Sequence, residues 1–173
     1  MTDNKNKMRL VSINDTDVRE ALQYEREFGI DSGTPLGFPN LNANLQTRGG
    51  EHCIVYGAPN TGKTTWVYSV VINQARYNGK KTLIWCPEEF STKHIYRKLM
   101  HMVSGKPLNE LNDKQVDDTA KFINDYFRVL ETPRLNVFWE SIESGCREYH
   151  KLWKFDNTVF DHAGMFEQEL DYV

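Results

Sequence analysis

Residues 57–64 constrain the fold of this chain more than any other stretch, and they read GAPNTGKT. They fit the pattern G-x-x-x-x-G-K-[ST] at each of its fixed positions. An apolar run at 53–56 precedes them, of the kind that fills a strand buried on both faces. Residues 64–77 follow with helical composition and without Gly or Pro. Because the pattern requires a strand, a glycine-containing loop and a helix in this order, we predict a phosphate-binding loop here.

The residue types of the loop explain how it would hold a phosphate. Gly57 and Gly62 allow backbone conformations that a side chain obstructs. Successive amides from Asn60 to Thr64 then point inward at the N-terminus of the helix and form an anion-binding nest. Lys63 is expected to reach the terminal phosphates, and the Thr64 hydroxyl to ligate Mg²⁺. The alternative is an ordinary glycine-rich turn.

The predicted nucleotide site covers the whole loop and one residue beyond it. Its members are Gly57, Ala58, Pro59, Asn60, Thr61, Gly62, Lys63, Thr64 and Thr65. Thr65 has a plainer alternative, as a residue of the first turn of the helix. The expected ligand is ATP with Mg²⁺, because the pattern pairs a phosphate cradle with a metal-ligating hydroxyl.

The composition is typical of one intracellular domain with one core. A chain of 173 residues and 20.2 kDa with 39% hydrophobic residues is long enough for such a core. The formal charge of −3 does not by itself indicate a nucleic-acid partner. Cys53, Cys86 and Cys146 have no zinc spacing, and two of them lie in apolar runs, as reduced thiols of a cytosolic core do. The sequence contains no transmembrane run and no signal peptide, so we expect a cytoplasmic protein without a membrane partner.

Helical and strand patterns alternate along the chain. Apolar residues at helical spacing predict further helices at about 15–28, 92–104, 116–127 and 137–153. Short apolar runs predict strands at 53–56, 82–86, 128–130 and 158–161. Such alternation implies right-handed crossovers and a mainly parallel sheet. We therefore predict a three-layer α/β domain whose ligands lie at the carboxyl ends of the strands.

Two parts of the chain are expected. Residues 1–28 form an N-terminal tail and a helix, which is either a plain surface helix or a linker that docks on a neighbouring subunit. Residues 29–173 form the α/β domain, and turns rich in Gly and Pro open it.

Three acidic residues lie at or just past the ends of predicted strands. Asp161 follows an apolar run, as the Mg²⁺-associated acid of a phosphate-loop enzyme does, and its alternative is a polar strand end. Glu88 and Glu89 follow the strand at 82–86, where a carboxylate can activate water against the γ-phosphate. Their alternative is a pair of first-turn acids favoured by the helix dipole.

The residues at about 29–165 resemble the RecA-like ATPase motor domain of DnaB-type replicative DNA helicases, including their bacteriophage and mitochondrial relatives. The stretches that carry the resemblance are TPLGFPNLN at 34–42, the loop region at 49–66, LIWCPEEF at 83–90 with SGKP at 104–107, and TVFDH at 158–162. The resemblance implies that Glu88 is the catalytic base and Lys63 a second catalytic residue. It also implies that Thr64 and Asp161 hold Mg²⁺.

The resemblance implies an enzyme that couples ATP hydrolysis to translocation on single-stranded DNA. Its relatives act as hexameric rings of identical subunits, some meet a primase, and they work in bacterial or phage-infected cells or in mitochondria. This chain departs from the family pattern at Leu36, which is inserted, at Asn42, where Asp is usual, and at Pro87, where a small or aliphatic residue is usual. The family's DNA-facing loops and arginine finger follow the second acidic motif, so we expect them beyond Val173 and the domain here to be partial.

Two other functions remain open at this point. One is an ATP-binding module without motor activity, regulatory or degenerate. The other is a small-molecule kinase with a phosphate-binding loop, although the sequence has no arginine-rich lid to support it. Stimulation of hydrolysis by single-stranded DNA separates the motor from both.

Overall fold

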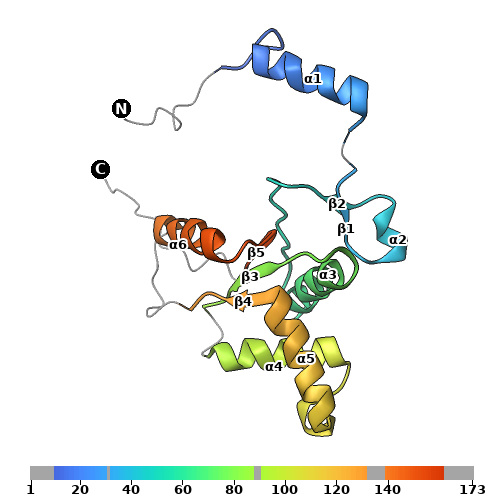
Figure 1. Ribbon diagram of the computed structural model, residues 1–173, viewed down its shortest axis with the longest axis vertical. Coiled ribbons are helices and arrows are strands. Elements are labelled where there is room, and N and C mark those ends of the chain that lie inside the picture. The colour runs from blue at the N-terminus through green and yellow to red at the C-terminus, as the bar shows by residue number, and fades with distance from the viewer. Residues whose placement is uncertain (1–9, 31, 88–90, 132–138, 162–173) are drawn as a thin grey trace. The chain divides into compact units, whose positions relative to one another are not determined.

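The structure is a computed structural model that describes residues 10–30, 32–87, 91–131 and 139–161 (Figure 1). The chain divides into two units, Met1–Gly33 and Thr34–Val173. The first unit contains α1 (Thr16–Phe28), a helix in which no residue is buried. It ends at Gly29, whose φ of 85° lies in the region that favours glycine and whose N–H donates to the Glu25 carbonyl. The helix expected at about 15–28 is therefore confirmed.

A three-stranded parallel sheet organises the second unit. Its strands are β3 (Thr82–Trp85), β4 (Phe127–Val129) and β5 (Asn157–Phe160), in the order β4-β3-β5. Leu83 lies opposite Arg128 on one side and Thr158 on the other. The three strands expected after the loop are confirmed to within one or two residues, and so is their parallel pairing. Because the strands are parallel, their carboxyl ends meet at one edge of the sheet.

The helices of the second unit begin and end close to where the sequence predicts. They are α3 (Lys63–Asn78), α4 (Thr92–Ser104), α5 (Asp113–Tyr126) and α6 (Trp139–Leu152), with a short 3₁₀ turn η1 (Leu108–Glu110) between α4 and α5. Ser91 caps α4 by accepting from the N–H of Lys93, and Gly105 ends it with a φ of 71°. Asn112 and Gln115 form a reciprocal capping box at the start of α5. No helix among the described residues is long and apolar enough to cross a membrane.

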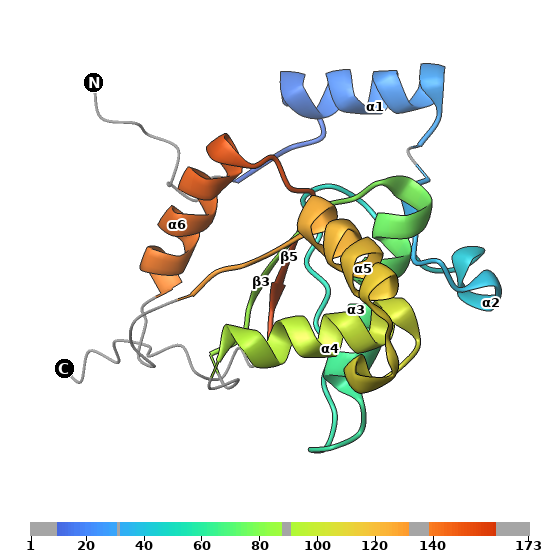
Figure 2. The same cartoon turned by 60° about the horizontal axis from the view of Figure 1, so that its bottom comes forward.

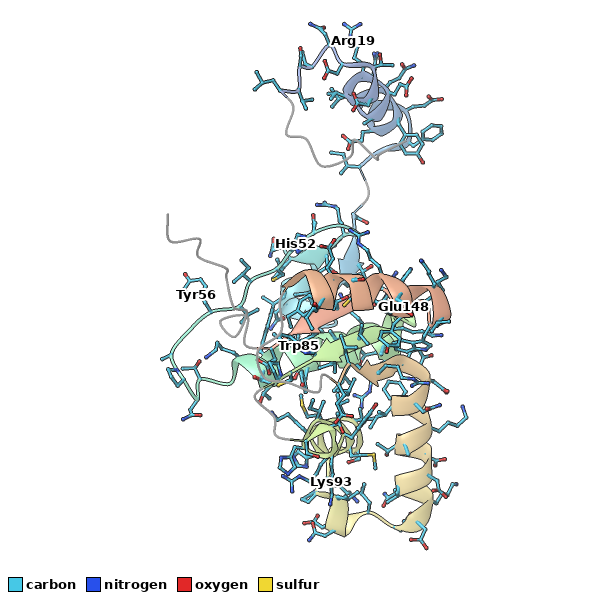
Figure 3. All side chains as sticks on the ribbon, turned by 90° about the vertical axis from the view of Figure 1, so that its left-hand side faces the viewer. Arg19, His52, Tyr56, Trp85, Lys93 and Glu148 are labelled. Atoms are coloured by element: carbon cyan, nitrogen blue, oxygen red, sulfur yellow. The ribbon has the colours of Figure 1, made fainter. Side chains whose placement is uncertain are left out.

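The core lies between one face of the sheet and three helices. Ile84 and Cys86 face this side, where the buried residues of α3, α4 and α5 meet them. On the other face, the ring of Trp85 packs edge-on against Phe160 at 6.3 Å, and Ile142 of α6 is buried. Figures 2 and 3 show α6 on the opposite side of the sheet from α4 and α5. The α/β class is thus confirmed, whereas a RecA-like core stays a prediction.

A small hairpin that the sequence did not predict precedes the loop. It pairs β1 (Thr34–Pro35) with β2 (Gln46–Thr47) in antiparallel fashion around the single-turn helix α2 (Pro39–Asn42). Leu36 is buried here, and the Asn42 Oδ1 accepts from the N–H groups of Gly37 at 3.0 Å and Phe38 at 3.1 Å. The inserted leucine therefore packs in the interior, and the amide of Asn42 fixes the turn.

A polar network joins this hairpin to the sheet. The buried Gln74 of α3 donates to the Thr47 Oγ1 at 2.8 Å and accepts from the Asn157 Nδ2 at 3.0 Å. Because Gln74 is only 2% exposed, these bonds replace the ones that water would have supplied. The hairpin is thereby held against α3 and the start of β5.

The strand expected at 53–56 is wrong. Residues 51–57 take no regular structure, and Ile54 and Tyr56 are 84% and 91% exposed. Figure 3 shows Tyr56 well away from the strand that carries Trp85. No described strand pairs with 53–56, so this run has neither the backbone partners nor the covered faces that a buried strand needs. Cys53, expected to be a core thiol, is exposed for the same reason.

Candidate functional site

The phosphate-binding pattern forms a loop that turns directly into a helix. Residues 57–62 are exposed, and α3 begins at Lys63. Gly62 stands at the helix start with a φ of 87°, and Asn60 has a φ of 61°. When residues with a positive φ alternate with residues of negative φ, their successive N–H groups point to the same side of the chain. This is the geometry of an anion nest. The backbone thus has the form that an anion at the N-terminus of α3 requires.

Lys63 lies folded back over this loop. Its ammonium donates to the carbonyl oxygens of Gly57 at 3.0 Å and Ala58 at 2.9 Å. Thr61 closes the same turn, because its Oγ1 donates to the Ala58 carbonyl at 2.8 Å. Hydrogen bonds between charged partners are stronger than those to a neutral carbonyl, so a phosphate at the loop would compete well for this ammonium.

The first glycine of the pattern lies close to two side chains of the loop. A Cβ at Gly57 would lie 3.3 Å from the Thr61 Oγ1 and 3.8 Å from the Lys63 Cδ. Thr64 and Thr65 both lie in the first turn of α3, where Thr64 is half-buried and Thr65 is exposed. The helical position of both threonines is confirmed, and their contact with nucleotide or metal stays a prediction.

Asp161 lies at the carboxyl end of β5, directly beside the end of β3. Its backbone N–H donates to the Trp85 carbonyl at 3.0 Å, and its Oδ2 accepts from the Cys86 thiol at 3.8 Å. The side chain is half-buried. The second acid of the predicted site thus stands at the edge of the sheet where an α/β domain binds its ligands.

Two parts of the predicted site make their hydrogen bonds locally. The hydrogen bonds of Lys63 stay within the loop, and those of Asp161 stay at the end of β3. No hydrogen bond or ion pair among the described residues joins the loop to Asp161. Glu88 and Glu89 lie outside the described residues, so the choice between them as base stays a prediction.

The metal site is also a prediction. Within 10–30, 32–87, 91–131 and 139–161, no three His, Cys, Asp or Glu side chains cluster as a metal site would need. The predicted Mg²⁺ ion would take one hydroxyl and one carboxylate from the protein and its other ligands from phosphate and water, so a search for such clusters does not test it. Thr64 and Asp161 supply those two ligand types.

Sequence reasoning missed the thiol beside the acid. Cys86 is 8% exposed at the end of β3 and contacts Asp161 across the sheet. The signal was a cysteine at the end of a buried run, next to a strand predicted to end in an acid. Only the order of the strands in the sheet, which periodicity does not give, makes these two residues neighbours.

Comparison with known proteins finds one informative similarity. The sequence is 26% identical to the Twinkle homolog protein, chloroplastic/mitochondrial, of Arabidopsis thaliana over 112 residues. The aligned part is 60% of this chain and 16% of that protein, so the chain spans about a sixth of the length of its relative. No protein-family profile matches the sequence.

Proposed function

We propose that this chain is the ATP-binding and ATP-hydrolysing part of a DnaB-like replicative helicase, which couples hydrolysis to translocation on single-stranded DNA. The observation that carries the proposal is the loop at 57–62 that enters α3 with the Lys63 ammonium folded across it. A left-handed glycine, a helix N-terminus and a lysine at one point are suited to the phosphates of a nucleotide.

Two further observations support the same function. Asp161 stands at the carboxyl end of β5, where a carboxylate can assist a Mg²⁺ ion. The similarity to a Twinkle homolog supports a helicase-related function. The name of that relative places it in chloroplasts or mitochondria, so the comparison does not support the expected location in the bacterial cytoplasm.

In this proposal each residue of the site has its own role in binding or hydrolysis. The loop amides and Lys63 bind the phosphates and offset charge on the transferred group. Thr64 and Asp161 hold Mg²⁺, which would neutralise charge on the phosphates. Glu88 accepts a proton from the attacking water. A homo-hexameric ring, single-stranded DNA and a primase are the partners that belong to this proposal.

One observation favours an ATP-binding module without motor activity. No described hydrogen bond connects the loop with Asp161, and the run at 53–56 that leads into the loop is exposed. A site whose parts stay separate would bind nucleotide without hydrolysing it. In a form of the protein that hydrolyses ATP, stimulation by single-stranded DNA supports the motor, and hydrolysis that single-stranded DNA leaves unchanged supports the module.

The test is titration with a fluorescent ATP analogue, with and without Mg²⁺. Lys63→Ala is expected to weaken binding about tenfold or more, since it removes a charged partner of the phosphates. Lys114→Ala, an exposed lysine of α5, is the matched control and is expected to bind as the unchanged chain does. Equal affinity in the two variants would overturn the proposed nucleotide site.

A further inference from the structure

The outer face of α4 carries an unusual concentration of positive charge. Residues 91–109 contain four of the chain's 21 Lys and Arg residues, two of its five His and none of its 24 Asp and Glu. Elsewhere acidic residues outnumber basic ones, which gives a chain of formal charge −3. Such local reversal of charge marks a surface that attracts anions.

The helical periodicity of α4 places these basic residues on one side of the helix. Ile95 and Leu99 face the core and are buried. Lys93, Arg97 and His101 recur at four-residue intervals and are exposed. Four residues of helix rise by about 6 Å, so Lys93 and Arg97, with the imidazole of His101 one step further, form a regularly spaced row. Figure 3 shows Lys93 on the side of α4 away from the sheet.

A groove runs beside this row. It has a volume of about 630 Å³ and is lined by four residues of α4, by Pro107, and by two residues of η1: His94, Arg97, Lys98, His101, Leu108 and Asn109. Its far wall is held in place by the turn after α4, where Ser104 Oγ donates to the Lys106 carbonyl at 3.0 Å. Lys98 is also held, with its ammonium 5.7 Å from the centre of the Tyr68 ring. These contacts fix the turn and Lys98 on the two sides of an open groove.

We infer that this groove binds the sugar–phosphate backbone of single-stranded nucleic acid. Two cations one helical step apart, Lys93 and Arg97, match successive phosphates of a polymer better than a single nucleotide. An arginine guanidinium can donate two parallel hydrogen bonds to phosphate oxygens. The imidazole rings offer flat surfaces on which a base can stack, and the Leu108 side chain offers an apolar contact. The choice of nucleic acid as the polyanion rests on the proposed function, whereas the basic groove does not.

Other polyanions fit the groove less well. A membrane surface would require a broader apolar rim, and Leu108, 43% exposed, is the one large apolar side chain of the lining. An acidic peptide does not present charge at fixed steps. These two classes therefore serve as competitors in the test.

The experiment uses the full chain and a fluorescein-labelled oligothymidylate, with binding followed by anisotropy over a range of salt. Lys93→Gln/Arg97→Gln is expected to bind about tenfold more weakly. The slope of log K against log salt should become shallower by about 1.4, since each phosphate contact on a single strand contributes about 0.7. Lys114→Gln/Lys151→Gln removes the same charge from exposed positions on α5 and α6 and should bind as the unchanged chain does.

Several outcomes would overturn the inference. One is equal affinity and equal slope in the two double variants. Another is tight, Arg97-dependent binding to polyglutamate or to phosphatidylglycerol vesicles with none to oligothymidylate. Both variants replace exposed side chains, so unchanged thermal unfolding is expected and is measured alongside. A chain that binds the ATP analogue but no oligothymidylate refutes this inference alone, and the reverse refutes the proposed nucleotide site alone.

Discussion

The thiol of Cys86 donates to the Oδ2 of Asp161 at 3.8 Å and so joins the carboxyl ends of β3 and β5. The same two strands are fastened by the Asp161 N–H, which donates to the Trp85 carbonyl at 3.0 Å. Both backbone and side chain thus fix Asp161 beside the strand that leads toward Glu88. The acid is therefore positioned by the sheet itself, before any nucleotide or metal is bound.

This arrangement separates a metal role for Asp161 from a structural one. Asp161→Asn keeps the size of the side chain and removes the charge, so the gain in ATP-analogue affinity on adding Mg²⁺ should largely disappear. Affinity without Mg²⁺ should change little. Cys86→Ala is the control, because it removes the thiol contact and leaves the carboxylate in place. A Mg²⁺ effect that survives in Asp161→Asn, or vanishes in Cys86→Ala, would contradict the metal role.

The two glutamates after β3 make a second comparison. If Glu88 is the base, Glu88→Gln should retain Mg²⁺-dependent binding of the ATP analogue and lose hydrolysis, by about 10²-fold or more. Glu89→Gln should be much milder. The measurement is steady-state phosphate release beside the binding titration, in a form of the protein that hydrolyses ATP. A larger loss in Glu89→Gln would move the base by one residue.

The relative reactivity of the three cysteines tests whether the run at 53–56 is exposed. Cys53 is exposed, Cys146 is half-buried and Cys86 is buried. Burial, and then the nearby Glu143 charge, raise the pKa of the Cys146 thiol, which lowers its thiolate fraction. Under native conditions a thiol reagent should therefore modify Cys53 first, Cys146 more slowly and Cys86 last.

The assignment of each phase uses Cys53→Ser, which should remove the fastest one. If residues 53–56 instead form a buried strand, as their composition suggested, Cys53 would be protected and this variant would leave the fast phase intact. Mass spectrometry of the singly modified chain gives the same answer independently.

The regular elements of the second unit followed from the sequence because local signals and tertiary packing agree there. The run at 82–85 is wholly apolar or small and becomes the buried central strand. Ser91 and Gly105 bound α4 through a side-chain cap and a left-handed glycine, both of which are local chemistry. Such signals depend on few neighbours, so composition and spacing are enough.

The features that the sequence did not predict depend on distant residues. The run at 53–56 has the composition of a buried strand, but burial needs a pairing partner, and no described strand pairs with it. The β1–β2 hairpin has strands of two residues and is held by Gln74, which lies 27 residues beyond Thr47. Periodicity does not describe either relationship. For the site, the sequence predicted the loop at the start of α3 and the position of Asp161 at the end of a strand, but not the contact of Asp161 with Cys86.

Asp156 gives a prediction about pH. Burial raises the pKa of its carboxyl, but the Lys81 N–H and the Lys80 ammonium lower it by more, so the net pKa lies below the usual 3.8. The folded state therefore gains stability from this group above pH 3.8, and loses it as the pH falls through the lowered pKa. Asp156→Asn should have a lower free energy of unfolding than the unchanged chain at neutral pH, and this difference should disappear in acid.

Urea unfolding at a series of pH values measures that gap. Asp117→Asn on the exposed side of α5 is the control for the general effect of removing one carboxylate. A gap that stays constant from neutral pH into acid would mean that Asp156 contributes through shape and hydrogen bonding of the neutral group, and not through its charge.

Gly37 and Asn73 make the sharpest stability prediction. Gly37 has a φ of 81°, and an added Cβ would overlap the Cβ of Asn73 on α3 and lie 2.9 Å from its Cγ. The Asn73 Nδ2 also donates to the Gly37 carbonyl at 3.2 Å, so the two backbones cannot separate without losing that bond. Gly37→Ala should therefore lower the free energy of unfolding by about 1–3 kcal/mol from backbone strain, with a further loss from the clash.

Thermal unfolding distinguishes this position from an ordinary loop glycine. A chain of this size loses about 2–4 °C in melting temperature for each kcal/mol. Gly49→Ala is the matched control, since no atom lies within 4 Å of its added Cβ and its φ is not positive. That variant should stay within about 0.5 kcal/mol of the unchanged chain. Equal melting temperatures for Gly37→Ala and Gly49→Ala would mean that the 34–47 hairpin does not pack on α3 as the structure has it.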